Sequence, residues 1–326
     1  MVIVLLFTSS LMYGEKVAVL EEISRPASIA VDNTQLYVVE GTTIFIYSLK
    51  NYKLIKKFGK AGEGPMEFRQ FATVTPHENK LIINSAGKVS FYSTRGKYQR
   101  EIKGKGGFNF IFLPLKDKFV AFGITAENSV TYRTVNLFDS QLNKIKEITR
   151  YKNFFQPGKK LNPMEVQGKT YQTLDDKIII DDFDGTFQVI DQAGQLVKSF
   201  KPTYQKYKLT DKHKEAILES YKTNPQTRRV YEQVKHLVEF PPYFPPVQGF
   251  ITADKSIYIH TYRRQGNTAE FFVYDINGKL MKHTWVPFFD ITPQAPHQYA
   301  ILNGKIYQIY ENVDDEEWEL HINKIL

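Results

Sequence analysis

The segment Ile44-Phe45-Ile46-Tyr47-Ser48 is an apolar strand that closes on an aromatic residue and a small polar one. Five later segments share this design: Val89–Ser93, Val135–Asp139, Phe187–Asp191, Phe271–Asp275 and Glu319–Asn323. A strand pattern that returns at intervals of tens of residues is typical of a supersecondary unit that buries its faces only by stacking on its copies. We call these six segments the signature strands.

Each signature strand is flanked by further strand-like runs. The first copy follows the apolar runs Ser28–Val31 and Leu36–Val39 and precedes the more polar run Lys53–Phe58. Dipeptides such as Ala193-Gly194 and Asn277-Gly278 suit tight hairpin turns, because glycine readily adopts positive φ. Four antiparallel strands per repeat, apolar inside and polar outside, predict an all-β fold: a six-bladed β-propeller.

The two ends of the chain complement one another. The last signature strand has no outer strand after it, whereas Lys16–Ile23 precedes the first blade without a partner of its own. An N-terminal strand that completes the last blade would close the ring and remove an exposed sheet edge. We therefore expect one propeller domain over residues 15–326.

Composition narrows the possible functions. The 326 residues include no Cys, which excludes disulfides, thiolate metal sites and a Cys nucleophile. The net charge of +8 favours an anionic partner or surface, or is simply a solvated basic surface. No segment resembles a nucleic-acid recognition helix, so we expect no nucleic-acid partner.

Residues 1–14 carry no charge and run from apolar to small residues. This pattern predicts a signal peptide and export to the periplasm or the extracellular space, with a buried N-terminal strand as the alternative. The segment is too short to span a bilayer, and no other stretch is long and apolar enough. We expect no transmembrane span in the mature chain; its oligomeric state is left open.

The linker Phe58-Gly59-Lys60-Ala61-Gly62-Glu63-Gly64-Pro65-Met66-Glu67-Phe68 is rich in glycine. It resembles the blade connection of NHL-repeat and TolB-like six-bladed propellers of secreted bacterial proteins. The resemblance extends in architecture over Lys16–Leu326, but this motif is clear only once. It implies the fold and export and no single activity, because such propellers include both binding scaffolds and enzymes.

The long connections should gather on one face of the ring. They are residues 151–169, 202–246 and 287–298, and loops of variable length on a rigid scaffold commonly carry binding sites. The longest predicts a helical insertion over about residues 203–246, between blades four and five. Thr210 should cap a helix from Asp211 to Lys222, and a second helix should run from Asn224 to Glu239.

The insertion has two further features. Its second helix places four apolar residues on one face, which predicts docking on the propeller: Val230, Val234, Leu237 and Val238. Between Lys201 and Glu239 there are nine basic and five acidic residues, so the insertion carries half of the net positive charge of the chain.

The loop 260–264, His-Thr-Tyr-Arg-Arg, should lie on the same face, near the returning Pro-aromatic segment 241–246. Arginine beside aromatic rings suits a carboxylate, a phosphate or an acidic sugar. The predicted ligand-binding residues are Arg263, Arg264, Tyr262, His260, Tyr243 and Phe244. The alternative is that these are solvated arginines beside a packed loop. We therefore hypothesise an exported scaffold that binds a protein, a peptide or a glycan. Anionic ligands are included among these.

A metal-dependent hydrolase or lyase of the lactonase type is the alternative function. Glu40, Asn84 and Asp181 end second strands near the channel mouth, where they would hold a metal. The loops 181–185 and 314–317 are rich in carboxylates and suit Ca²⁺, or are ordinary solvated turns. There is no HExxH, Gly-x-Ser-x-Gly or phosphate-binding motif, so no cofactor is predicted and a non-enzymatic role is favoured.

Overall fold

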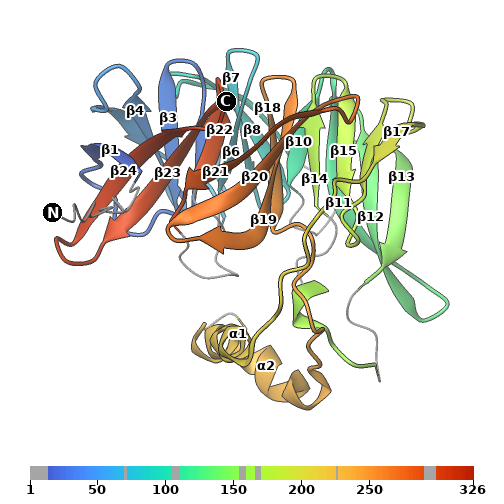
Figure 1. Cartoon of the computed structure of the whole chain (residues 1–326). Helices are drawn as coiled ribbons and strands as arrows, with labels where there is room; N and C mark the ends of the chain where they lie inside the picture. The colour runs from blue at the N-terminus through green and yellow to red at the C-terminus, as the bar shows by residue number, and fades with distance from the viewer. Residues whose placement is uncertain are drawn as a thin grey trace, which may run out of the picture.

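A computed structural model describes residues 14–69, 72–103, 111–153, 159–165, 170–224, 227–289 and 299–326. Six four-stranded antiparallel sheets stand side by side in a ring, which confirms the six-bladed propeller (Figure 1). Residues 1–13 lie outside the described residues, so the signal peptide stays a prediction. Among the described residues, no helix has the length and apolar character needed to cross a membrane.

Each blade uses its strands in the same order. The innermost strands are β2 (Ser28–Val31), β6 (Thr73–His77), β10 (Phe112–Leu115), β14 (Tyr171–Leu174), β18 (Gly249–Ala253) and β22 (Tyr299–Leu302). The second strands are β3 (Gln35–Glu40), β7 (Lys80–Ser85), β11 (Lys118–Glu127), β15 (Lys177–Asp181), β19 (Ser256–Gln265) and β23 (Lys305–Asn312). The third strands, which contain the signature segments, are β4 (Thr43–Ser48), β8 (Lys88–Ser93), β12 (Val130–Phe138), β16 (Phe187–Ile190), β20 (Thr268–Asp275) and β24 (Glu317–Lys324). The outermost strands are β5 (Leu54–Phe58), β9 (Tyr98–Lys103), β13 (Lys144–Lys152), β17 (Leu196–Phe200), β21 (Leu280–Pro287) and β1 (Glu15–Val19).

The N-terminal strand closes the ring as predicted. β1 pairs antiparallel with β24, with Glu15 opposite Ile322 and Val19 opposite Glu319. The last blade therefore combines strands from both ends of the chain, in the order β1-β24-β23-β22. No further strand is needed to protect the edge of β24.

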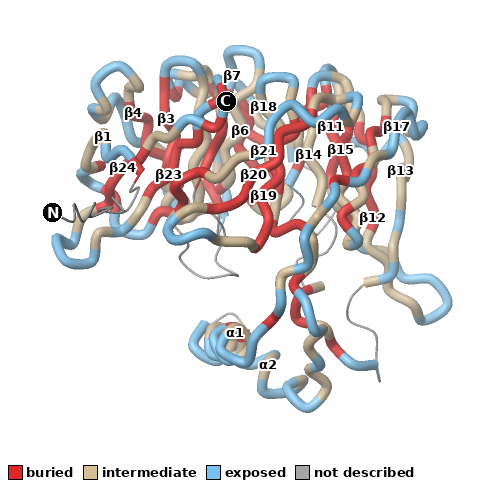
Figure 2. The backbone as a smooth tube through the Cα atoms, in the orientation of Figure 1, coloured by how far each residue is buried: buried red, intermediate tan, exposed pale blue. Residues whose placement is uncertain are grey.

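Apolar residues of neighbouring blades pack against each other and form a core at each blade junction. Where the ring closes, Leu36 and Tyr47 of the first blade pack with Trp318 and Leu320 of the last. Five similar clusters occupy the other junctions. Because both faces of a blade are covered, the signature strands are buried almost continuously, as the tube view shows (Figure 2).

The hairpin turns form where they were predicted, and one departure from regular strand pairing recurs in every blade. Gly96, Gly194 and Gly278 all have positive φ, between 70° and 77°, at the hairpins into outer strands. A β-bulge interrupts the pairing of the third strand with its outermost neighbour in every blade. Bulges increase the local twist of a strand.

The helical insertion lies below the ring in Figure 1. α1 (Asp211–Thr223) begins at the Thr210 cap, whose side chain accepts a hydrogen bond from the backbone of His213, as predicted. α2 (Arg228–Val234) is shorter than predicted and is followed by a 3₁₀ turn, Lys235–Leu237.

The predicted docking of the second helix on the propeller is wrong. No residue of α2 is buried, and Val230 is 57% exposed. Instead, Leu237 and Glu239 exchange backbone hydrogen bonds with Leu161, of the connection between blades three and four.

Candidate functional site

Two arms of the chain connect the insertion to the ring. The outgoing arm leaves blade four at Pro202, and the returning arm enters blade five at Pro246. Backbone hydrogen bonds join them: Leu209 N donates to Pro242 O (3.1 Å), and Phe244 N donates to Tyr207 O (2.9 Å). The insertion is therefore attached by a short paired stalk.

A small apolar core fixes the stalk to blade five. Met164, Leu209, Ile217 and Phe244 pack there against Tyr262, which lies near the end of β19. The rings of Phe244 and Tyr262 stack with centroids 4.4 Å apart, and the ring of Tyr207 also stacks with that of Phe244, with centroids 5.5 Å apart. These aromatic contacts set the position of the insertion relative to the propeller.

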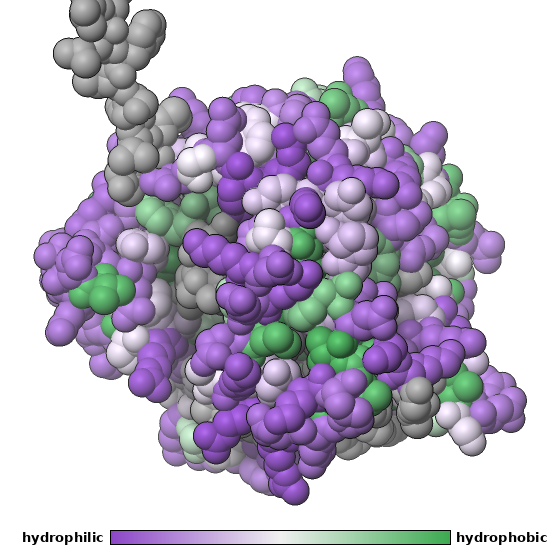
Figure 3. Space-filling model, turned by 60° about the horizontal axis from the view of Figure 1, so that its bottom comes forward, coloured by the Kyte–Doolittle hydropathy of each residue, from purple (hydrophilic) through white to green (hydrophobic). Residues whose placement is uncertain are grey.

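A groove of about 250 Å³ lies between the arms and the rim of blades four and five. Its walls include Asp184, Tyr204, Lys206, Phe244, Tyr262 and Arg263. Figure 3 brings forward the lower side of Figure 1, where the insertion lies, and this side is largely hydrophilic with scattered apolar patches. The groove combines aromatic walls with charged groups, as ligand-binding sites commonly do.

Arg263 is held in the groove wall by a buried carboxylate. Glu270 of β20 is 1% exposed and accepts a hydrogen bond from Arg263 Nη1. Its oxygens also contact Thr261 Oγ1 (2.8 Å) and His283 Nε2 (3.0 Å). The guanidinium lies over Trp285, with Cζ 5.4 Å from the ring centroid.

This arrangement leaves donors of Arg263 available to a ligand. A guanidinium has five N–H donors, and within the described part of the chain Glu270 is the one side chain that accepts from Arg263. The Arg263 side chain is 25% exposed and the residue lines the groove, so its remaining N–H groups are candidates for binding a ligand there. Glu270 and Trp285 thus fix the orientation of a fork suited to carboxylates or hydroxyls.

The rim of the groove carries further charges. Lys206 is exposed, and its Nζ lies 5.3 Å from the Tyr243 ring centroid. Lys201 Nζ lies 2.8 Å from Asp184 Oδ2, and the hydrogen bonds of Asp184 with Lys201 and Thr186 lower its pKa to about 2. Asp184 is therefore a charged acceptor at neutral pH.

The structure divides the six predicted ligand-binding residues. Tyr262, Phe244 and Arg263 line the groove, and Tyr243 lies beside it under Lys206. Arg264 instead donates to Gln248 Oε1 (2.6 Å) and to the Thr261 carbonyl (2.7 Å), so it braces the scaffold.

His260 is fully buried, and its Nδ1 lies 3.0 Å from Tyr299 Oη. Like Arg264, it is not among the described residues that line the groove.

Three functional residues escaped sequence reasoning: Tyr204, Lys206 and Glu270. The run Tyr204-Gln205-Lys206-Tyr207, between Pro202 and the helix cap, offered a signal because two aromatic residues flank two polar ones. Glu270 offered another, since it is an acidic residue directly before the apolar signature strand Phe271–Asp275. A charge at such a position needs a partner once it is buried.

The three proposed pore ligands have separate partners. Glu40 accepts hydrogen bonds from Ser24, and the Asn84 amide bonds to both the N–H and the carbonyl of Phe112, in the next blade. Asp181 borders a smaller cavity of about 30 Å³ next to Gln248 and Tyr262. The contacts of Glu40 and Asn84 are typical of structural roles, and a metal at these residues stays a prediction.

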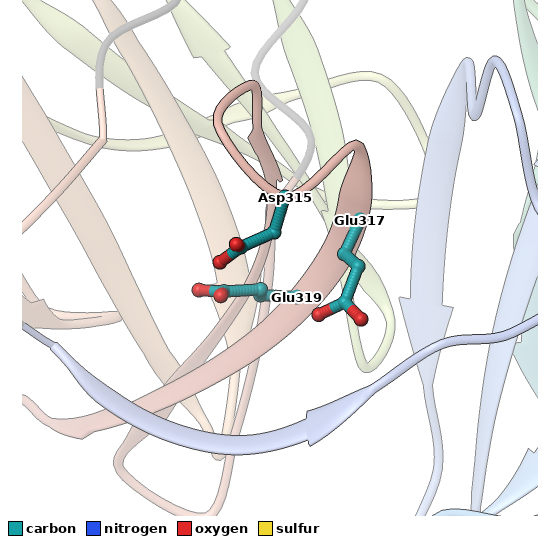
Figure 4. A group of neighbouring side chains, drawn as sticks. All are labelled: Asp315, Glu317 and Glu319. Carbon is teal, nitrogen blue, oxygen red and sulfur yellow. The ribbon is translucent and has the colours of Figure 1, made fainter.

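A carboxylate cluster lies where the ring closes. Asp315, Glu317 and Glu319 bring their oxygens within 4.8 Å of one another (Figure 4). Lys16 Nζ, from β1, lies 2.6 Å from Glu319 Oε1 and 3.8 Å from Glu317 Oε2. The ammonium of Lys16 thus offsets part of the negative charge of this cluster, and we interpret the pair of Lys16 with Glu319 as a latch between β1 and β24. Ca²⁺ binding there, or at residues 181–185, stays a prediction.

The chain is similar in structure to solved proteins, and the match with the higher TM-score of the two given below supports the fold. A crystal structure of a DUF4221 family member from Bacteroides vulgatus is 12% identical, with a TM-score of 0.50, and the match covers 96% of this chain and 98% of that one. BamB from Moraxella catarrhalis is 8% identical, with a TM-score of 0.40, over 92% and 85%. No family model matches the sequence, and no curated protein matches it.

At these identities the likeness shows the propeller fold alone. The finer resemblance to NHL-repeat and TolB-like propellers stays a prediction.

Proposed function

We propose that this chain is a propeller scaffold that binds a protein, peptide or glycan ligand in the groove between its helical insertion and blade five. The observation that carries the proposal is Arg263, which lines the groove while its guanidinium is held by Glu270 and Trp285. Holding a donor fork in place before binding lowers the cost of ordering it in the complex.

The site belongs to the face with the long connections, as expected for a rigid scaffold with variable loops. The aromatic walls supply apolar contact, and Lys206 and Arg263 supply attraction for an anionic group. The proposal also includes export, which is supported by the composition of residues 1–14, because it suits a signal peptide.

The Lys206→Glu variant is expected to bind the physiological ligand about tenfold more weakly, because a rim cation becomes a like charge for an anionic ligand. Glycan and peptide arrays probed with wild-type protein would supply ligands, and titration calorimetry would give the affinities. Lys206 is exposed, so the substitution should leave the fold intact.

Lys212→Glu is the matched control, since it makes the same charge change in the same insertion, on α1 and outside the groove lining. It should bind within about twofold of wild type, because Lys212 is exposed and does not line the groove, so solvent and salt screen its charge. Equal binding by both variants and wild type, or no ligand on either array, would contradict the proposal.

A further inference from the structure

The groove offers both donors and acceptors at its walls. Arg263 presents N–H donors, Asp184 presents a charged carboxylate, and Gln205 presents an amide with both kinds of group. The Lys201–Asp184 pair is exposed, with side chains 51% and 61% accessible, so it is weak and can rearrange around a ligand. Such a set matches a polyol, whose hydroxyl groups donate and accept at once.

The apolar part of the groove suits a ring. Tyr204, Phe244 and Tyr262 line it, and the volume of about 250 Å³ is below the range usual for drug-sized ligands. One ring of a longer chain fits such a space better than a folded peptide segment does. Aromatic faces carry partial negative charge, so they attract the slightly positive C–H groups on a sugar face.

Backbone recognition of a peptide is disfavoured here. Pro202, Pro245 and Pro246 line the groove, and proline has no backbone N–H to offer an extended peptide. Peptides that add to a protein by strand pairing depend on such donors. The side chains are therefore the main polar partners, which favours a glycan.

The charge of the groove selects among glycans. The groove has three cations in its lining, Lys201, Lys206 and Arg263. They are balanced by two carboxylates, Asp184 in the lining and Glu270, which is buried behind Arg263. Lys206 has no carboxylate partner among the residues that the structure describes. The surplus cation lies at the rim, within reach of a negative group on the ring.

We propose that the groove binds a carboxylated sugar, a uronate residue of an acidic glycan, with its carboxylate at Arg263 and Lys206 and its ring against the aromatic wall. This inference rests on the proposed function, because it assigns the ligand class of the same groove. Glu270 is a positioning residue in it, since it acts on the ligand through Arg263.

Titration calorimetry with a panel of oligouronates (polygalacturonate, alginate and hyaluronan fragments) tests the inference. Wild-type protein should bind at least one of them, and the carboxyl-reduced form of that fragment should bind at least about tenfold more weakly, because the charge-assisted hydrogen bonds are lost. Arg263→Gln should lose a similar factor, and Lys212→Glu should bind as wild type. Circular dichroism and thermal melting check that Arg263→Gln is folded, and the exposed Lys206→Glu variant provides a second test.

The outcomes separate the ligand class from the groove. Binding of no uronate, equal binding of the reduced fragment, or equal competition by polyglutamate would overturn the uronate assignment. If the reduced fragment or polyglutamate binds wild type but not Lys206→Glu, binding still takes place in the groove, and only the assignment of a uronate as the ligand class is wrong. If a uronate binds wild type, Arg263→Gln and Lys206→Glu equally, both the class and the groove are contradicted.

Discussion

Replacing Glu270 with alanine is expected to lower the free energy of unfolding by about 2–4 kcal/mol. Removing one partner of a buried ion pair costs about 3–5 kcal/mol because the other charge is left uncompensated. The expected loss is somewhat smaller here, since Arg263 keeps 25% of its side chain exposed. Urea unfolding followed by Trp fluorescence would measure the shift of the midpoint, because Trp285 lies over Arg263.

Glu270→Gln is the matched control, because it keeps the side-chain volume and an acceptor for Thr261 while removing the charge. Its free energy of unfolding should lie between those of wild type and Glu270→Ala. Both variants should also weaken ligand binding, since the orientation of Arg263 depends on the carboxylate. An unfolding midpoint for Glu270→Ala equal to that of wild type would show that the carboxylate does not anchor the groove wall.

The latch between β1 and β24 is expected to make stability depend on pH in the acid range. Burial alone would raise the pKa of Glu319, but hydrogen bonds from Lys16, Asn312 and His321 outweigh it and lower the pKa to about 2. A carboxylate whose pKa is depressed on folding stabilises the protein above its ordinary value of 4.5, and this contribution is lost as the pH falls through the folded value. The window of loss is therefore from about pH 4.5 to about pH 2.

The Glu319→Gln variant isolates this contribution. At neutral pH it should be about 2 kcal/mol less stable than wild type, allowing for partial solvent screening of the pair with Lys16. The difference should shrink toward zero as the pH falls to about 2, while other carboxylates titrate alike in both proteins. A difference that stays constant from pH 7 to pH 2 would rule out the electrostatic latch.

Local patterns were enough to predict the ring. The signature strands are apolar and recur along the chain, and Gly96, Gly194 and Gly278 mark hairpins that can be predicted from the neighbouring residues alone. The complementary ends also predicted that β1 completes the last blade. These features depend on residues close in sequence, or on a count of repeats.

The rest depends on contacts between distant segments. The 3₁₀ turn after α2 follows from backbone pairing of Leu237 and Glu239 with Leu161, more than 70 residues earlier. The register shifts between third and outer strands were not predicted, because the pairing partner of each residue is not visible in the sequence. Sequence reasoning placed Arg263 on the correct face, but it could not show that Glu270 buries its carboxylate against it while Arg264 turns to Gln248.

The account depends most on the claim that the ligand occupies the groove between the insertion and blade five. Hydrogen–deuterium exchange, with and without the ligand returned by the arrays, tests this claim most directly, because binding slows the opening of the contacted segments. Protection is expected in the outgoing arm, residues 203–209, and in the end of β19, residues 261–264. Protection confined to the turns after Glu40 and Asn84, at the channel mouth, would contradict the groove and favour the rival site.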